Sequence, residues 1–221
     1  MAKKRVMIVG GGLAGLAAAM RLAEMGVDAD LMSLAPVKRS HSVCAQGGIN
    51  SCNDLTRQSG DSEWKHFDDT VYGGDFLQHQ PPVKEMADWG PKIIDLMDRL
   101  GCPFNRTQEG YLDRRRFGGT LYKRTAFSGA TTGQQLLYAL DEQVRRWEVG
   151  GKVHKYEHWD FLGPILDDRP VNGKAPLPAA VWAGILRDAR PATLVVWLDP
   201  ADVQNLAATG VRLASCDQFL L

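Results

Sequence analysis

Residues 4–34 read KRVMIVGGGLAGLAAAMRLAEMGVDADLMSL, and this stretch decides the fold. A short apolar run rich in β-branched side chains ends at Gly10 and predicts a buried parallel strand. The pattern then predicts an amphipathic helix over 13–25, ended by Gly26, and a second strand over 27–34. This strand–turn–helix–strand order is typical of an α/β, Rossmann-like domain, in which a βαβ unit starts a parallel sheet.

The turn after the first strand carries the pattern G-x-G-x-x-G. The first glycine permits a tight turn, the second lets a pyrophosphate approach the backbone, and the third lets the helix pack on the strand. The N-terminus of the helix adds N–H donors and positive potential. The pattern predicts a dinucleotide site, and the alternative is a tight turn without a ligand. The predicted site consists of Gly10, Gly11, Gly12, Leu13, Ala14 and Gly15.

A carboxylate that would bind the ribose of the dinucleotide is not clearly placed. Asp28 and Asp30 open the second strand instead of closing it. The closing residue is Ser33, which offers a single hydroxyl group where such sites often have an acidic side chain. The residues alone therefore leave NAD and FAD as alternatives.

The composition indicates an ordinary soluble domain. The 221 residues include 26 basic and 26 acidic side chains, and without a basic excess we expect no binding of nucleic acid. The four cysteines lack C-x-x-C spacing, which predicts free thiols in a reducing compartment and no metal site. The uncharged run over 6–20 imitates a signal peptide, but it contains four glycines and continues as the amphipathic helix. It is also shorter than the ~20 residues of a membrane-spanning helix, so we expect no direct membrane span.

Beyond the first unit, the pattern predicts a glycine-rich ordered loop over 35–53 and irregular structure over 103–132. Helices are expected over 63–76, 82–100 and 133–149, and two strands of a small ribbon over 153–161 and 164–166. The second of these helices has apolar side chains at Met86, Trp89, Ile93, Ile94 and Met97. After residue 168 the composition changes, and the last 53 residues hold five of the eleven prolines and no glutamate, histidine or tyrosine. Strands at 181–186 and 193–198 and a short helix opened by 199–200 are expected there.

The segment PVKRSHSVCAQGGIN, residues 36–50, resembles the flavin loop of the succinate dehydrogenase and fumarate reductase flavoproteins. Within that family it is most similar to the menaquinone-linked bacterial type. The similarity continues through 60–84 and 104–146 and ends with KYEHWDFLGPILDD at residue 168. The resemblance implies FAD as the cofactor and an FAD-binding domain over 1–168. The family commonly has serine at the position of Ser33.

The resemblance also implies roles for individual residues. His41 stands where the family's histidine is bonded covalently to the flavin, and an imidazole nitrogen is a competent nucleophile near neutral pH. The alternative is a histidine that only forms hydrogen bonds in the loop. Further positions that line the flavin ring or the pyrophosphate are matched by Arg39, Ser40, Ser42, Gln46, Gly47 and Gly48. The glycine pair would let backbone N–H groups reach the N5 and O4 region of the ring.

Two residues match positions beside the dicarboxylate substrate of the family, namely Gly47 and Phe117, although plain core packing is the alternative for Phe117. A nearby basic stretch would draw a dianion towards the flavin by local steering. A solvated surface or a contact with a partner subunit explains the same residues equally well. The stretch consists of Arg114, Arg115, Arg116, Lys123 and Arg124.

The family's activity is the interconversion of succinate and fumarate, with electrons passed to an iron–sulfur subunit, a membrane-anchor cytochrome b subunit and quinone. The resemblance thus implies an oxidoreductase that is cytoplasmic and peripheral on the inner face of the cell membrane through these partners. One alternative is an FAD enzyme like L-aspartate oxidase, although that branch binds FAD without a covalent link, so His41 argues against it. A non-catalytic remnant is the other alternative.

Residues 169–221 match none of the family's later segments, which include the mobile capping domain and most of the catalytic residues. A frameshift, a fragment or a fusion to an unrelated tail would each account for this, and the abrupt break favours the frameshift. We therefore expect an incomplete FAD-binding domain without the capping domain, no retained catalytic residue, and no succinate oxidation by this chain alone.

Overall fold

The computed structural model describes residues 5–159, 161, 164–165, 181–182 and 192–195. The chain divides into two compact units. The first is formed by Met1–Ser40 together with Leu140–Leu221, and the second by His41–Ala139. The chain crosses between them twice, between Ser40 and His41 within the stretch 36–50 and again between Ala139 and Leu140.

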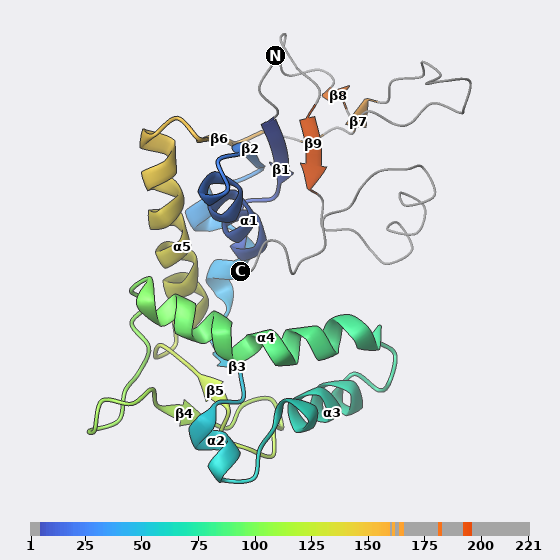
Figure 1. Cartoon of the computed structure of the whole chain (residues 1–221), viewed down its shortest axis with the longest axis vertical. Helices are drawn as coiled ribbons and strands as arrows, with labels where there is room; N and C mark the ends of the chain where they lie inside the picture. Colours follow the sequence, from blue (N-terminus) through green and yellow to red (C-terminus); the bar gives the residue numbers. More distant parts are fainter. Residues whose placement is uncertain (1–4, 160, 162–163, 166–180, 183–191, 196–221) are drawn as a thin grey trace. The chain divides into compact units, whose positions relative to one another are not determined.

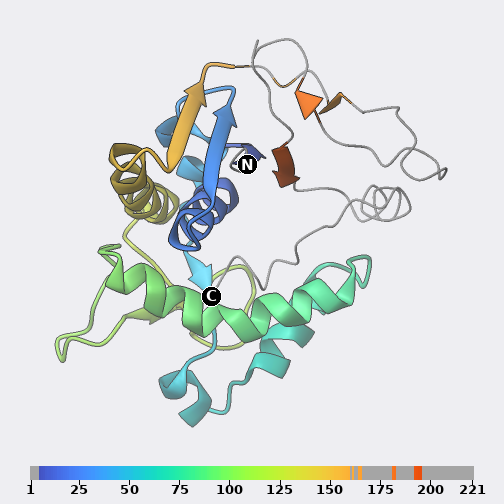
Figure 2. The same ribbon diagram turned by 45° about the horizontal axis from the view of Figure 1, so that its top comes forward.

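The first unit is built on a parallel sheet. Its strands are β1 (Arg5–Val9), β2 (Asp28–Ser33), β6 (Val153–Glu157) and β9 (Ala192–Val195), in the spatial order β6-β2-β1-β9. All neighbouring pairs are parallel. Figure 2 shows β2 and β6 running side by side in the same direction. The predicted parallel sheet and the βαβ unit at its centre are confirmed.

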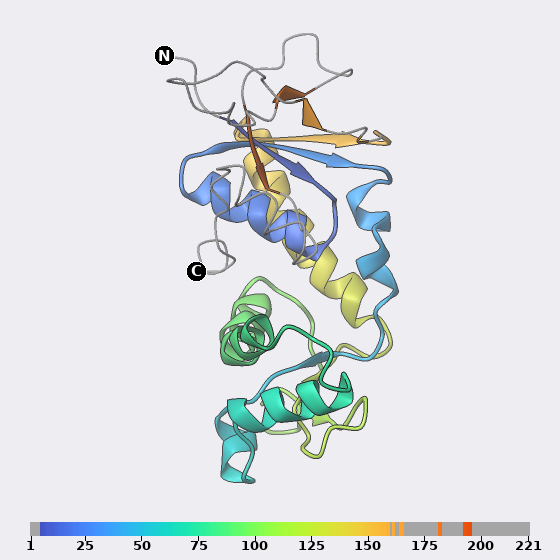
Figure 3. The ribbon, with the colours of Figure 1, turned by 90° about the vertical axis from the view of Figure 1, so that its right-hand side faces the viewer.

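Helix α1 (Leu13–Glu24) forms the connection between β1 and β2 and follows from its sequence. Leucine, methionine and alanine are good helix formers, and the alanines let the helix lie close to the sheet. The C-cap of the helix is Met25, and the next residue, Gly26, has a φ of +78° that suits a glycine and an N–H that donates to Ala23 O at 3.0 Å. Figure 3 shows α1 and α5 (Thr132–Val149) on the same face of the sheet. The buried side of α1 consists of Leu16, Ala18, Ala19, Met20, Leu22 and Ala23.

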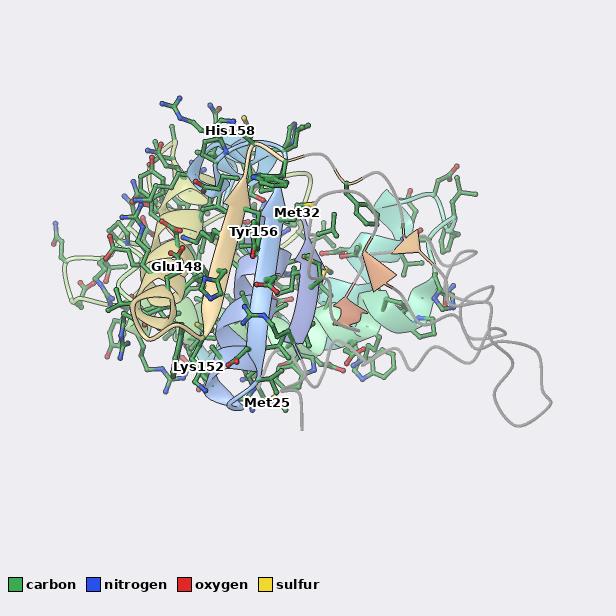
Figure 4. The ribbon with its side chains drawn as sticks, turned by 90° about the horizontal axis from the view of Figure 1, so that it is seen from above. Met25, Met32, Glu148, Lys152, Tyr156 and His158 are labelled. Carbon is green, nitrogen blue, oxygen red and sulfur yellow. The ribbon has the colours of Figure 1, made fainter. Side chains whose placement is uncertain are left out.

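The predicted ribbon over 153–161 and 164–166 is wrong. The first of its strands is β6, which joins the main sheet beside β2, with Ala29 opposite Val153 and Ser33 opposite Glu157. Figure 4 labels Lys152 and His158, which flank this strand. The second is β7 (Pro164–Ile165), which pairs antiparallel with β8 (Val181–Trp182). β6 and its parallel partner β2 lie far apart in the sequence, so no local pattern indicates that they pair. Two strands that follow each other closely suggest an antiparallel hairpin instead.

The predicted strands at 181–186 and 193–198 correspond to the shorter β8 and β9. The helix expected after residue 198 lies outside the described residues.

The second unit combines helices with a small antiparallel sheet. Its helices are η2 (His41–Cys44), α2 (Asp54–Gln58), α3 (Glu63–Gly73), α4 (Gln80–Arg99) and the beginning of α5. Its strands are β3 (Ile49–Asn50), β4 (Arg114–Arg115) and β5 (Thr125–Ala126), in the order β3-β5-β4. The helices α3 and α4 lie side by side (Figure 1). The three predicted helices over 63–76, 82–100 and 133–149 are confirmed, with their ends shifted by a few residues.

The buried face of α4 differs from the expected one. Its buried residues are Ala87, Gly90, Ile94 and Met97, whereas Met86 is 46% exposed. Small residues on this face allow close packing, since a Cβ on Gly90 would lie 3.3 Å from Ser51 Cβ. Ile94 and Met97 are buried as the apolar pattern predicts, whereas Ala87 and Gly90 were missed because they carry little hydrophobic signal of their own.

Candidate functional site

The glycine-rich turn joins β1 to α1 in the first unit and requires glycine at two positions, at one because of its backbone conformation and at the other because of close packing. Gly10 has a φ of +117°, and its N–H donates to Met32 O at 2.9 Å, which holds the turn against β2. A Cβ on Gly15 would overlap the carbonyl oxygen of Gly10. The turn is therefore as tight as the sequence pattern predicts.

Gly11 lies close to two segments that the sequence also predicts to bind the cofactor, the end of β2 and the start of the flavin loop. A Cβ there would lie 2.6 Å from Ser33 Oγ and 2.7 Å from Val37 Cγ1, at the start of η1 (Val37–Arg39). The structure thus brings Ser33, at the carboxyl end of β2, next to the glycine turn. In parallel α/β sheets, ligands bind outside the carboxyl ends of the strands, so this is the expected edge for a nucleotide.

The N-terminus of α1 suits an anionic group. Gly12 is the N-cap with an extended ψ of −171°, no side chain caps the helix, and the first turn has no acidic residue. Since no carboxylate offsets the positive end of the helix dipole, the backbone there favours a phosphate.

The end of β6 and the residues after it support the same edge of the sheet, although the sequence assigned them no role there. Glu157 Oε1 accepts a hydrogen bond from the Val37 N–H at 2.8 Å, and Trp159 N–H donates to Ser33 O at 3.1 Å. The chain turns between them at His158, which has a φ of +65°. No local signal identifies these residues, because their position depends on the long-range pairing of β6 with β2.

The two aspartates of β2, Asp28 and Asp30, form ion pairs. Asp30 binds Arg5 at two points, with Nε–Oδ2 of 2.8 Å and Nη2–Oδ1 of 2.6 Å, and this pairing raises the pKa of Arg5. Asp28 lies 3.5 Å from Lys152 Nζ. Both carboxylates are buried and stabilise the sheet, so neither is placed as a ribose ligand.

The residues that follow η1 leave a polar atom unsatisfied. The hydroxyl oxygen of Ser40 is buried and has no hydrogen-bond partner among the described residues, while Arg39 is exposed. A buried polar atom without a protein partner is the kind of group that a ligand satisfies. The glycine turn and Ser40 thus both fit a bound dinucleotide.

In the second unit, the part of the predicted flavin loop that follows Ser40 packs against the start of α5. His41, at the start of η2, is exposed. A Cβ on Gly133 would overlap Ser42 O, and the Gly133 N–H donates to Ala45 O at 2.7 Å. The backbone of the loop is therefore fixed, while the imidazole of His41 remains accessible.

The glycine pair of the loop packs closely on its surroundings. A Cβ on Gly47 would overlap the ring of Phe117, so the structure brings together the two residues predicted beside the substrate. Gly48 has a φ of +116°, and its Cβ would lie 2.5 Å from Ala126 O and 2.6 Å from Thr125 Cγ2, on strand β5. Gln46, which precedes the pair, is exposed.

The basic stretch is not a basic surface. Arg114 Nη1 donates to Ser51 O at 2.8 Å, and burial lowers the pKa of this arginine. Arg115 contacts the loop carbonyls, and Arg124 is fully buried in an ion pair. Of the five cationic residues, Arg116 and Lys123 are exposed. Arg114 and Arg115 bind backbone carbonyl oxygens and Arg124 binds carboxylates, so the five residues do not form one continuous exposed surface.

The described residues contain neither a candidate metal site nor a candidate membrane span. No three histidine, cysteine, aspartate or glutamate side chains gather into a candidate metal site within the described part of the chain. None of the helices described here has the length and apolar character needed to cross a lipid bilayer.

A family model described as the FAD binding domain matches residues 5–175. The chain belongs to this family. It is 65% identical over 168 residues to the succinate dehydrogenase flavoprotein subunit of Bacillus subtilis, and the match covers 76% of this chain and 28% of the relative. It is 34% identical over 189 residues to the fumarate reductase flavoprotein subunit of Helicobacter pylori, covering 76% of this chain and 26% of that protein. The chain thus spans less than a third of the length of these relatives.

Solved structures agree with this assignment. A chain of the Escherichia coli quinol fumarate reductase matches with a TM-score of 0.68 at 32% identity, covering 76% of this chain and 28% of the other. The predicted resemblance, the α/β FAD-binding fold and FAD as the cofactor are confirmed. The covalent link at His41, the individual site residues and the domain boundary at residue 168 stay predictions.

Proposed function

We propose that this chain is the FAD-binding part of a flavoprotein subunit that interconverts succinate and fumarate. The observation that carries the proposal is the glycine turn at the carboxyl edge of the sheet, where Gly15 and Gly11 exclude a Cβ and Ser33 lies alongside. The family match and the similarity to flavoprotein subunits support the choice of FAD over other dinucleotides.

The first unit would hold the nucleotide half of FAD. The backbone over Gly10, Gly12 and Gly15, with Gly11, Leu13 and Ala14 between them, would bind the pyrophosphate at the N-terminus of α1. Ser33 would donate to the ribose, and Ser40 and Arg39 would bind the cofactor from the segment after η1. The unsatisfied hydroxyl of Ser40 supports this role.

The second unit would hold the flavin half. The exposed imidazole of His41 would form the covalent link to the flavin, which prevents loss of the cofactor. The side chains of Ser42 and Gln46 and the backbone of Gly47 and Gly48 would line the ring. When bound, FAD supplies the group that exchanges a hydride with the substrate.

The substrate and the partners extend the same proposal. Gly47 and Phe117, which are packed together, would lie beside the dicarboxylate. Electrons would pass to an iron–sulfur subunit and, through a membrane-anchor cytochrome b subunit, to quinone. The protein would then be cytoplasmic and peripheral, held at the inner face of the cell membrane by these partners.

The proposed covalent bond between His41 and the flavin can be tested directly. The 221-residue chain is produced in cells that supply FAD, denatured, separated by gel electrophoresis and viewed under ultraviolet light in acid. We expect a fluorescent band that disappears in His41→Ala and persists in His154→Ala, which replaces an exposed histidine on β6.

Three other outcomes would overturn parts of the proposal. A fluorescent band in His41→Ala would exclude His41 as the point of attachment. Yellow protein from which all FAD is extracted by denaturation would exclude the covalent link and favour an enzyme like L-aspartate oxidase. Colourless, aggregated protein would favour the non-catalytic remnant.

A further inference from the structure

Arg115, on strand β4, holds the backbone of the flavin loop within the second unit. Its Nη2 donates to Gly47 O at 2.7 Å and to Gln46 O at 3.2 Å, and its Nε donates to Gly47 O at 3.2 Å. The guanidinium carbon lies 4.2 Å from the centre of the Phe127 ring and 5.7 Å from that of Phe117. Two aromatic rings and two carbonyl oxygens thus fix the cation in one orientation.

The two carbonyl groups belong to the peptide units that carry the N–H groups of Gly47 and Gly48. The Gln46 carbonyl and the Gly47 N–H are opposite ends of one peptide, and the Gly47 carbonyl and the Gly48 N–H are opposite ends of the next. A cation that binds the oxygen of a peptide draws electron density from its nitrogen, so the N–H becomes a stronger donor. Arg115 therefore polarises both peptides in the same sense.

We propose that Arg115 is a positioning residue that sets the reduction potential of the bound flavin through the peptides of Gly47 and Gly48. This inference rests on the proposed function, in which these two N–H groups face the ring. A flavin ring gains electron density on reduction, so stronger N–H donors stabilise the reduced form more than the oxidised form. Arg115 thereby raises the potential without touching the flavin itself.

Contacts that do not involve Arg115 also hold the flavin loop in place, so the fold of the loop does not depend on Arg115 alone. Gly48 is enclosed by Ala126 O and Thr125 Cγ2, and Ala45 O accepts a hydrogen bond from the Gly133 N–H. Loss of the guanidinium therefore leaves the loop seated on β5 and α5 but removes the positive charge from its carbonyls. The expected change is in the electronic properties of the flavin more than in the folding of the chain.

The test compares Arg115→Gln, Arg115→Lys and the matched control Arg116→Gln in the 221-residue chain loaded with FAD. Arg116 is the exposed neighbour, and its replacement removes the same charge from the same segment. The reduction potential of bound FAD is measured against a reference dye, together with the melting temperature.

For Arg115→Gln we expect the equilibrium between reduced and oxidised bound FAD to shift about tenfold towards the oxidised form, which lowers the midpoint potential by about 30 mV. Arg115→Lys should recover part of this shift, because it keeps the charge but not the fork of donors. Arg116→Gln should keep the wild-type potential.

An Arg115→Gln protein with the wild-type potential, or an equal shift in Arg116→Gln, would overturn the inference. If Arg115→Gln does not retain FAD, the potential of Arg115→Lys decides: a value below wild type supports the inference and an identical value overturns it. Failure of the wild-type chain to bind FAD would instead overturn the proposed function, and the inference with it.

Discussion

Arg124 and Asp61 form a two-point ion pair in which neither side chain is exposed. The Nε–Oδ2 distance is 3.0 Å and the Nη2–Oδ1 distance is 2.6 Å. Arg124 Nη1 also donates to Asp69 Oδ2, on α3, at 2.7 Å. Because Arg124 directly precedes β5, this buried cation joins α3 to the strand that encloses Gly48 of the flavin loop.

Removing the cation from this pair should destabilise the chain strongly. In Arg124→Met the Asp61 carboxylate stays buried without a counter-ion, and such losses typically cost about 3–5 kcal/mol. Urea unfolding at neutral pH measures the cost. The double variant Asp61→Asn/Arg124→Met should lose less than the sum of its single variants, because the neutral amide at position 61 needs no counter-ion. Additive losses would show that the two residues are not coupled.

His66 should make stability depend on pH. It is buried near Arg124, and burial, followed by the charge of Arg124, lowers its pKa below the ordinary value of 6.5. The unfolded chain therefore binds a proton at a higher pH than the native chain. The stability is fully present above pH 6.5 and is lost as pH falls below it, by up to about 1.4 kcal/mol per pH unit.

The pH effect is measured as the free energy of unfolding from about pH 7.5 to about pH 5.5. His66→Gln cannot titrate, so its stability should fall less over this window than that of the wild type. His154→Gln, at an exposed position on β6, is the control and should keep the wild-type pH dependence. Parallel pH curves for wild type and His66→Gln would contradict the assignment.

Gly15→Ala should weaken FAD binding. The added Cβ would overlap Gly10 O, a backbone atom that cannot rotate away, so the turn itself must shift. In a His41→Ala background, in which FAD binds without a covalent link, we expect a loss of about 1–3 kcal/mol in stability and about tenfold in FAD affinity, measured by thermal unfolding and by quenching of flavin fluorescence.

The matched control for this substitution is Gly73→Ala at the end of α3. No atom lies within 4 Å of a Cβ at that position, and alanine favours the helix. Gly73→Ala should therefore keep the FAD affinity and gain up to about 1 kcal/mol in stability. Equal FAD affinities in the two variants would show that Gly15 does not shape the nucleotide turn.

The first βαβ unit could be predicted because all of its determinants are local. The glycine turn, the alanine-rich helix and Ser33 at the end of β2 lie within about thirty residues, the length of such a unit. The place of β6 could not be predicted, since nothing near Val153 indicates that its partner is Ala29. The contacts of Glu157 and Trp159 with the nucleotide edge were missed for the same reason.

The roles of the arginines needed the structure as well. In the sequence, Arg115 and Arg116 are equivalent members of a basic stretch, but in the structure the first binds loop carbonyls and the second is exposed. Arg124 differs from both, because its carboxylate partners lie more than fifty residues earlier. Charge alone does not distinguish a buried ion pair from a solvated surface, whereas hydrogen-bond partners do.

Asp141, on α5, should be as sensitive as Arg124, but in the first unit. Its carboxylate is fully buried and lies 2.5 Å from Lys155 Nζ, 3.0 Å from Arg145 Nε and 3.6 Å from Lys38 Nζ. Asp141→Asn leaves these cations close together, although Lys155 keeps Glu148 at 2.8 Å. We expect a loss of about 3 kcal/mol in urea unfolding.

Glu142→Gln removes the same charge from the next residue of α5, which is exposed, and it should change the stability by less than about 0.5 kcal/mol. An equal loss in both variants would mean that the charge of α5, and not the buried cluster, sets the cost. A large loss confined to Asp141→Asn would show that one carboxylate joins α5 to β6 and to the η1 segment beside Gly11. The stability of the nucleotide edge would then depend on a residue far from it in the sequence.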